Sequence, residues 1–457
     1  MMNRQLDFFL IQRIFYQISP FLILPYIARI FGPEGIGQIA LAMATFVFFN
    51  YFASLGAATY GQKIISDKNN KLKKKYLLAS DILISKTILC FLPLILYLSY
   101  IIFFSESPIK ILLIILVFDL MLNSIDTTWF HYALKNFKIV SICLIISRII
   151  SIILIYTYVD NINDTYLYLI FLSVPNFLAY VYILCKSKII LKLNNLNLNK
   201  IFKHLKIFFT IGFALSGMLF IAYSDKLMLY FFTNSYSTLG FYDLITKFIM
   251  LPLGITMALS TFSITFYNKN NFNNNLVNSL LNLNILFTFT YFILLFFNGD
   301  QIIFYFLGDK FKDMLTPLVI YSYILPIRSI NIFILSSVMI KEGKYILISK
   351  LIYTALILNI LANFFLIPKF ELYGAIYSSI ISEIYLFMSI LYFNNEKITQ
   401  NKYLNLTMLV ILQFILIFSV NLLFEYEKIL KLIFSCIIGS PIILVYYFMF
   451  RGKKIAL

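Results

Sequence analysis

Hydrophobic residues in this chain fall in long continuous runs and not in alternating patterns. The stretch from Ile142 to Tyr156 is apolar almost throughout, which is typical of a membrane-spanning helix and unlike the alternating strands of a membrane barrel. Runs bounded by charge, Gly, Pro or Asn predict fourteen spans. The predicted spans cover residues 8–30, 38–59, 77–104, 109–130, 138–159, 165–185, 207–232, 239–265, 276–297, 314–340, 345–367, 372–393, 402–424 and 429–450. The sequence therefore predicts an all-α integral membrane protein.

Composition supports this interpretation and excludes other classes. Of 457 residues, 61% are hydrophobic and 12% are charged, a balance foreign to soluble globular domains and to disordered chains. At about 20 residues per span, the length accommodates about a dozen spans or more. The net charge of +17 must lie in short loops of so apolar a chain, so it reports membrane topology and does not indicate nucleic-acid binding.

The distribution of basic residues predicts the orientation. With the N-terminus inside, the inner segments carry 23 Lys and Arg and the outer loops carry seven, together with ten acidic residues. Because cytoplasmic loops hold the excess of Lys and Arg, both termini are predicted to be cytoplasmic. The cluster from Lys71 to Lys75 is interpreted as part of this anchoring, in preference to a docking site for an anionic partner.

A weak internal repeat predicts two halves. The turn from Phe31 to Gly37 follows the first span and that from Tyr236 to Tyr242 follows the seventh, with Gly37 and Gly240 in equivalent places. Parallel repeats of this kind are a transporter architecture, with the substrate path at the interface between halves. The predicted division is an N-terminal six-helix half (1–185), a basic cytoplasmic linker (186–206), a C-terminal six-helix half (207–393) and two additional helices with a tail (394–457).

Charged residues inside the spans are the candidates for function. Each costs about 2.5–3.5 kcal/mol at a helix centre on insertion scales, so it should face the bundle interior or a watery cavity. We expect a cationic lumen that compensates a phosphate or pyrophosphate, with structural pairing as the alternative for each base. The lumen candidates are Arg13, Arg148, Lys247 and Arg328.

Other residues inside the predicted spans are candidates for ion coupling, for charge pairing and for hinge motion. Asp126 and Glu383 are candidates for ion or proton coupling because they are intramembrane carboxylates. Asp119 and Asp126 share a helix face and are expected to partner Arg148 on the next helix. Pro25, Pro252 and Pro326 are hinge candidates, since each frees a backbone carbonyl within its span.

No motif of enzymatic chemistry is present in the sequence. The four cysteines and two histidines lack metal or redox spacing, and no Walker A, GxSxG or HExxH pattern occurs. We therefore expect a transporter, with no catalytic residue, metal site or cofactor. Trp129, the only tryptophan, lies at a predicted span end and is expected to anchor it at the membrane interface.

Three segments resemble a known family. These are the run from Phe31 to Gly37 continuing to Ala53–Gly61, the end of the fourth span at Thr127–Phe130, and the stretch from Leu366 to Phe370 followed by Tyr373–Ile376 and by Ser382 with Glu383. They resemble the polysaccharide transport branch, including O-antigen (Wzx-type) flippases, of the multidrug/oligosaccharidyl-lipid/polysaccharide (MOP) flippase superfamily. The chain departs from the family at Phe370–Gly374, where a glycine more usually follows directly.

The resemblance implies a V-shaped pair of six-helix bundles in the bacterial inner membrane. It implies flipping of an undecaprenyl-pyrophosphate-linked oligosaccharide, of O-antigen (lipopolysaccharide) or capsule type, from the cytoplasmic to the outer leaflet. By likeness, Arg13 and Lys247 fall where basic lumen residues are expected. Expected partners are the lipid-linked substrate, membrane lipid, a polysaccharide polymerase and a chain-length regulator. The alternatives are a MATE-like small-molecule antiporter and, less favoured, a membrane polysaccharide polymerase.

Overall fold

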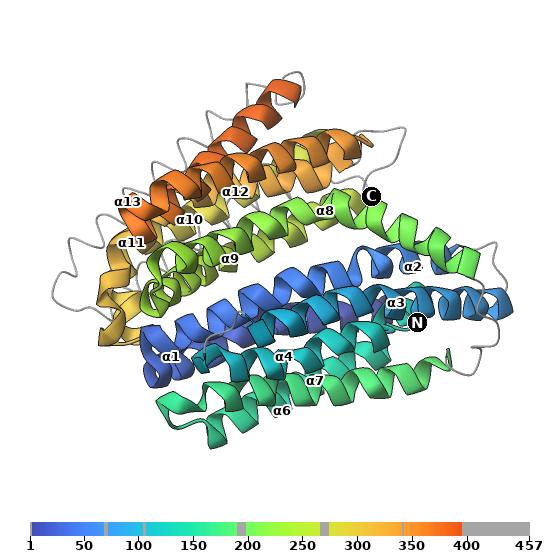
Figure 1. Ribbon diagram of the computed structural model, residues 1–457. Coiled ribbons are helices and arrows are strands. Elements are labelled where there is room, and N and C mark those ends of the chain that lie inside the picture. The colour runs from blue at the N-terminus through green and yellow to red at the C-terminus, as the bar shows by residue number, and fades with distance from the viewer. Residues whose placement is uncertain are drawn as a thin grey trace. The chain divides into compact units, whose positions relative to one another are not determined.

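The computed structural model describes residues 2–67, 72–103, 107–189, 198–265, 274–340 and 342–394, and within these ranges every regular element is a helix (Figure 1). The predicted spans 402–424 and 429–450 lie outside the described residues. The helices are α1 (Met2–Ser54), α2 (Ala57–Ser66), α3 (Leu72–Phe103), α4 (Ser107–Ile125), α5 (Thr128–Ala133), α6 (Phe137–Tyr158), η1 (Ile162–Asp164), α7 (Thr165–Ser187), α8 (Leu198–Thr233), α9 (Tyr236–Thr265), α10 (Asn274–Phe306), η3 (Asp309–Met314), α11 (Leu315–Ser322), α12 (Ile324–Phe333), the π-helical η4 (Ile334–Met339) and α13 (Tyr345–Asn394).

The all-α membrane fold is confirmed, whereas the number fourteen stays a prediction. In the described ranges, eight helices are long and apolar enough to cross a membrane, or ten if each of two bent helix pairs is one span. Two of the eight, Asp7–Ser66 and Tyr345–Phe393, contain 60 and 49 residues. At 1.5 Å per residue these are far longer than a bilayer of about 30 Å requires.

Each of the two longest helices is a hairpin. In α1 the backbone leaves helical geometry at Gly32 (φ 64°), and both arms return to one end of the fold. Phe9 packs against Tyr132, and Gly61, just beyond α1, lies against the Trp129 ring. A straight helix would separate Phe9 from Gly61 by about 78 Å. The chain therefore reverses at Gly32, between the predicted spans 8–30 and 38–59.

The reversal in α13 occurs at Glu371, whose φ of 48° and ψ of −118° lie outside helical geometry. The hydroxyl of Tyr385 donates to that of Thr354 at 3.1 Å, which brings the two arms together. A side chain at φ near +50° is strained, because the Cβ atom crowds the backbone. This is the loop where the sequence departs from the family pattern. Glu371 adopts backbone angles that suit glycine, so the turn is strained although the hairpin forms.

The chain divides into two compact units. The first contains Met1–Tyr230 and Asn234–Gly240, and the second contains Phe231–Thr233 and the described residues from Phe241 onward. Most of α8 therefore packs with the first unit, although the repeat assigns it to the second half. Packing units and sequence repeats measure different things, so the boundaries 1–185, 186–206, 207–393 and 394–457 stay a prediction.

The two repeat-related glycines meet within the first unit. A Cβ atom on Gly37 would overlap the backbone carbonyl of Tyr236, and one on Gly240 would overlap that of Pro33. A shift of 203 residues carries Pro33 onto Tyr236 and Gly37 onto Gly240, and so exchanges the two contacts. This is the reciprocity expected at a two-fold axis, and it fits the predicted repeat.

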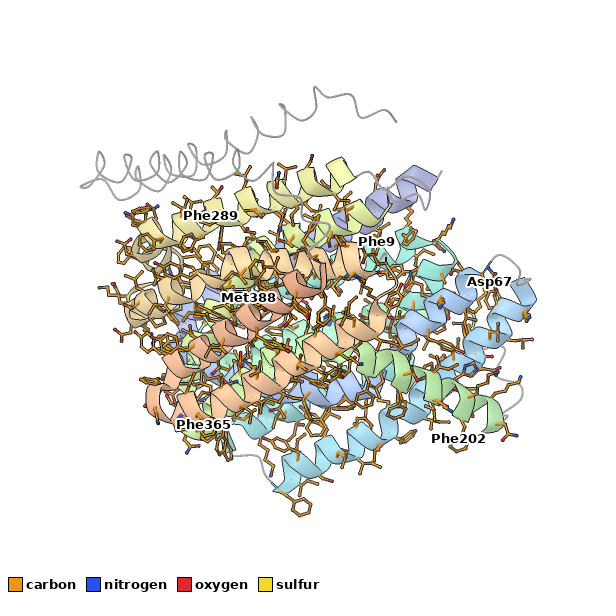
Figure 2. The ribbon with its side chains drawn as sticks, turned by 90° about the horizontal axis from the view of Figure 1, so that it is seen from above. Phe9, Asp67, Phe202, Phe289, Phe365 and Met388 are labelled. Carbon is orange, nitrogen blue, oxygen red and sulfur yellow. The ribbon has the colours of Figure 1, made fainter. Side chains whose placement is uncertain are left out.

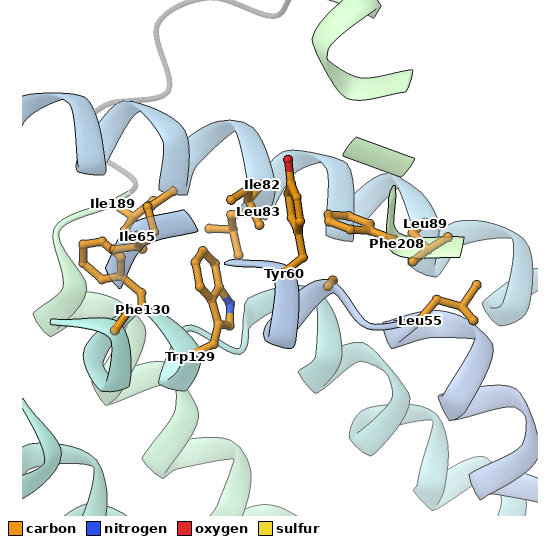
Figure 3. Close-up of a cluster of buried hydrophobic side chains, with 13 residues drawn as sticks. Leu55, Tyr60, Ile65, Ile82, Leu83, Leu89, Trp129, Phe130, Ile189 and Phe208 are labelled. Carbon is orange, nitrogen blue, oxygen red and sulfur yellow. The ribbon is translucent and has the colours of Figure 1, made fainter. Parts of the chain in front are cut away.

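A buried apolar cluster joins α2, α3, α5 and α8 of the first unit (Figure 3). Its largest member is Trp129, which is 2% exposed and lies among residues of α2, α3 and α5. Its indole nitrogen donates to the backbone oxygen of Asp126 at 3.0 Å. The expectation of an interface anchor is wrong, because the ring is enclosed by protein. By contrast, large apolar side chains such as Phe365 and Met388, both labelled in Figure 2, are exposed by 64% and 60%.

Candidate functional site

Helices α1 and α6 of the first unit run in the same direction and contact each other along their length. The Tyr16 hydroxyl donates to the backbone oxygen of Leu144 at 3.3 Å, and the Tyr26 hydroxyl donates to that of Val159 at 2.9 Å. Between these two contacts, Ser19 lies beside Arg148. Polar residues of the two helices consequently meet along one line through the bilayer.

Pro20 prepares the central contact of this line. Proline has no N–H and therefore leaves the carbonyl of Tyr16, four residues earlier, without its helical donor. The hydroxyl of Ser19 donates to that carbonyl at 3.3 Å. The Ser19 oxygen in turn accepts a hydrogen bond from Nε of Arg148 at 2.8 Å. A helix-breaking residue thus orients the hydroxyl that holds an arginine.

Arg148 lies at the middle of its span. It is ten or eleven residues from each end of α6, which is about 15 Å from either end. Besides the hydrogen bond to Ser19, the guanidinium carbon lies 5.8 Å from the centre of the Tyr16 ring. Among the described residues, no carboxylate lies within ion-pair distance of Arg148. Its charge at the bilayer midplane is therefore not balanced by the described part of the chain.

Hydroxyl and amide groups surround this arginine. Asn176 of α7 accepts hydrogen bonds from Tyr16 at 3.3 Å and from Ser147 at 3.1 Å. We call Tyr16, Ser19, Ser147, Arg148 and Asn176 the polar seam. Guanidinium N–H groups match phosphate oxygens, and hydroxyl and amide groups match those of sugars. The seam has the functional groups required for a phosphorylated sugar.

Arg13 lies two turns nearer the start of α1 and is exposed. Its guanidinium carbon is 5.1 Å from the Phe9 ring, and it too has no ion-pair partner among the described residues. Six residues separate it from Ser19, or about 9 Å along the helix. Six residues also place Arg13 and Ser19 about 120° apart around the axis of α1, so Arg13 projects from another face of the helix, closer to its predicted cytoplasmic end than the Ser19–Arg148 contact.

The expected pairing of Asp119 and Asp126 with Arg148 is wrong. Asp119 accepts a hydrogen bond from Ser173 at 2.5 Å, and Asp126 pairs with Lys86 at 3.4 Å. Lys86 is 1% exposed, so Asp126 neutralises a buried cation. Helical spacing suggested a shared face for the two carboxylates, but Asp126 lies just beyond the end of α4, and the two groups contact α7 and α3 respectively.

In the second unit, both lumen candidates are ion-paired. Lys247 pairs with Asp243 one turn earlier on α9 at 2.7 Å, and its side chain is 36% exposed. Arg328 of α12 pairs with Glu383 of α13 at 2.9 Å, and both are buried. Ion pairing is the alternative that the sequence left open for each base, and a lumen role for Lys247 and Arg328 stays a prediction.

Glu383 is the centre of a wider network. Its second oxygen accepts from Asn331 at 2.7 Å, and Arg328 also donates to the Tyr321 hydroxyl at 3.4 Å. Tyr321 stacks on Tyr242 of α9 with ring centroids 6.1 Å apart. The network links α9, α11, α12 and α13, so Glu383 has the surroundings of a structural carboxylate.

The three hinge candidates lie in different local geometries. Ser322 ends α11, and the helices Asp309–Ser322 and Ile324–Met339 are inclined by 49°. Pro326 follows Ser322 by four residues, where its ring would clash with the Ser322 carbonyl of a straight helix. Helices α1 and α9 continue through Pro25 and Pro252, where the backbone angles stay helical. Hinge function stays a prediction for all three.

Metal coordination has no candidate in the part of the chain that the structure describes. No group of three or more His, Cys, Asp or Glu side chains converges there. The chemistry of the site is that of binding: guanidinium and ammonium groups, hydroxyls and amides, and paired carboxylates.

The described fold is that of a polytopic helical membrane protein. The chain is similar in structure to the lipid II flippase MurJ in an inward closed conformation, with 18% identity, 99% coverage of each chain and a TM-score of 0.77. It is also similar to the MATE multidrug transporter DinF-BH (15% identity, 85% and 95% coverage, TM-score 0.56) and to a MATE transporter of Vibrio cholerae (14%, 88% and 98%, 0.54). At these identities the likeness concerns the fold alone.

Residues 8–265 match the family model described as polysaccharide biosynthesis protein. The chain belongs to this family, as the three resembling segments predicted. No curated protein matches the chain significantly.

Sequence reasoning selected the charges of the site but missed its neutral groups. Tyr16, Ser19 and Asn176 are ordinary residues of apolar spans, and no spacing marks them. The available signal was Pro20, since a proline in a span leaves a carbonyl that a nearby hydroxyl can satisfy.

Proposed function

We propose that this protein flips a lipid-linked oligosaccharide repeat unit, carried on undecaprenyl pyrophosphate, from the cytoplasmic to the outer leaflet by alternating access through a cationic lumen. The repeat unit is of O-antigen or capsule type. Membership of the polysaccharide biosynthesis family and a flippase-type fold support this proposal. The site described above adds a chemical argument.

The observation that carries the proposal is the unbalanced charge of Arg148. An arginine at the bilayer midplane costs several kcal/mol unless an anion compensates it. Lys86, Lys247 and Arg328 each have a carboxylate, whereas Arg148 has a serine hydroxyl. A pyrophosphate moving through the lumen would supply the missing negative charge, and the polar seam would hydrogen-bond the first sugars.

Arg13 extends the path toward the predicted cytoplasmic end. A head group entering there would meet an exposed guanidinium first and Arg148 about 9 Å further along α1. In this scheme Lys247 contributes through its exposed fraction, and Arg328 shapes the second unit through Glu383. A membrane potential negative inside would favour outward movement of the anion by about 2.3 kcal/mol per charge per 100 mV.

A MATE-like small-molecule antiporter is the second candidate, because MATE transporters share the fold. The unpaired arginines favour an anionic substrate. A cationic drug would be repelled by Arg148.

The test is deletion of the gene in its host, with the initial sugar transferase intact, followed by analysis of the lipid-linked repeats on each membrane face. We expect single completed repeats to accumulate on the cytoplasmic face. Wild-type protein should relieve this accumulation, and Arg148→Ala should not. Arg148→Lys should restore it in part, because an ammonium keeps the charge but loses the planar donor geometry.

Arg13→Ala and Lys247→Ala test the extended path and should impair export less than Arg148→Ala. Lys350→Ala is the control, since Lys350 is an exposed base in the second turn of α13 and is not part of the polar seam. Equal membrane levels of all variants must be shown by immunoblot. Accumulation on the outer face would instead indicate a polymerase, and normal glycolipid with altered drug sensitivity would indicate an antiporter.

A further inference from the structure

The first part of α8 has the structure of a helix that lies at a membrane surface. The segments Asn199–Phe213 and Ser216–Thr233 are inclined by 63°. The second segment contains 18 residues and is about 27 Å long, which is nearly the thickness of the hydrocarbon core. The bilayer crossing therefore does not require Asn199–Phe213, which we call the surface segment.

One face of the surface segment is fixed to the first unit. Ile201, His204 and Phe208 are buried on it. His204 shares a hydrogen bond with the Tyr60 hydroxyl at 3.0 Å, and Phe208 belongs to the apolar cluster of Figure 3.

A charge pair adds to this attachment. Lys200 pairs with Asp81 of α3 at 3.5 Å. The segment is consequently held in one rotation about its axis, and its remaining faces point away from the first unit.

Those remaining faces form two adjacent sectors. At 100° per residue, Phe202, Phe209 and Phe213 fall within about 40° of one another, and they are exposed by 67%, 43% and 45%. Figure 2 shows Phe202 toward the same end of the first unit as Asp67.

Beside the aromatic sector lie Lys203 and Lys206, both exposed. Among the described residues, neither lysine has a carboxylate within ion-pair distance. An aromatic sector flanked by a basic one is the arrangement of helices that lie in the membrane interface.

We propose that this exposed face of the surface segment binds anionic phospholipid headgroups. The phenyl rings enter the acyl boundary while the lysine ammonium groups contact the headgroup phosphates above it. Charge complementarity selects anionic lipid over zwitterionic lipid, because each basic residue near an anionic surface contributes about 1 kcal/mol. The site depends on membrane insertion and on the bend in α8, and it is independent of which substrate the transporter carries.

The experiment uses the full-length protein in liposomes of phosphatidylcholine with phosphatidylglycerol. Phe202→Trp adds a second indole to the single Trp129, which is buried. We expect bromine on the acyl chains to quench the added fluorescence, and brominated phosphatidylglycerol to quench more than brominated phosphatidylcholine at equal content. No added quenching by either lipid, or equal quenching by both, would overturn the proposal.

Charge removal tests the selectivity independently. In the Phe202→Trp background, the double change Lys203→Gln with Lys206→Gln should lower the preference for phosphatidylglycerol by about fivefold per lysine. The matched control is Lys310→Gln with Lys312→Gln, two exposed lysines of η3, which should leave the preference unchanged. A preference that survives loss of Lys203 and Lys206, or that falls equally in the control, would refute the assignment. Trp129 emission identifies any variant that fails to fold.

Discussion

Asp126 holds a buried cation, and this can be measured by exchanging charges. Its carboxylate lies 3.4 Å from Nζ of Lys86, and its backbone oxygen lies 3.2 Å from the same atom. Lys86 is 1% exposed and Asp126 is 18% exposed. Asp126→Asn keeps an oxygen that can accept from the backbone N–H of Thr128, a bond of 2.8 Å in the native chain, and removes only the charge.

The two single changes should be unequal. Asp126→Asn leaves an uncompensated ammonium with almost no access to water, which costs about 3–5 kcal/mol. Lys86→Met leaves the more exposed carboxylate, so we expect a cost of about 1–2 kcal/mol. Lys86→Met with Asp126→Asn removes both charges and should lie within about 1 kcal/mol of wild type. The coupling energy is then about 3–7 kcal/mol.

Unfolding in mixed micelles, followed by Trp129 fluorescence, measures these differences. The indole reports on this place because it donates to the Asp126 backbone oxygen at 3.0 Å. Additive costs would refute the charge-pair argument. Export in the deletion strain is the second readout. If the variant with both Lys86→Met and Asp126→Asn is stable but inactive, Asp126 has the coupling role predicted from sequence. If that variant is active, the role of Asp126 is structural.

Three further changes test the turns and bends. Glu371→Gly should stabilise the protein by about 1 kcal/mol, because glycine relieves the strain at φ 48°. The greater entropy of glycine in the unfolded chain offsets part of this stabilisation. A lower unfolding midpoint in micelles would contradict the prediction. Gly37→Ala and Gly240→Ala should each destabilise by about 3 kcal/mol, since each methyl group meets backbone, and the double variant should cost less than the sum; unchanged thermal stability of either single variant would argue against the reciprocal contact. Pro326→Ala should reduce the 49° bend between α11 and α12. Distances between spin labels on the two helices measure the bend, and unchanged distances would show that it has another cause.

Sequence alone predicted the elements whose cause is local. Continuous apolar runs gave the helices, and the turns near Gly32 and Glu371 were placed between the correct spans. The strain at Glu371 could not be predicted, because a resemblance shows that a glycine is absent and does not give the dihedral angles that replace it. The hydrophobic pattern also concealed the break between α4 and α5 at Asp126 and Thr127, since the apolar residues of α5 continue the run.

Partners across helices were the main gap. The prediction that Arg148 pairs with Asp126 was wrong, because Lys86 is the partner of Asp126. Trp129 was misjudged for a related reason: its position near a span end suggested lipid contact, whereas α2 and α3 enclose it. Helical periodicity gives the face of each residue, but only packing gives the neighbour.

The hairpins at Gly32 and Glu371 have a consequence for biogenesis. Each joins two apolar arms through a reversal with few charged residues, Arg29 and Glu34 at the first and Lys369 with Glu371 at the second. On the predicted topology these are the only charges that either turn carries across the hydrocarbon core during insertion, where each ion costs several kcal/mol. Two arms that pair as they emerge can enter the bilayer together as one helical hairpin, with their backbone hydrogen bonds already satisfied. The tightness of the turns thus lowers the barrier to assembling the protein in the membrane.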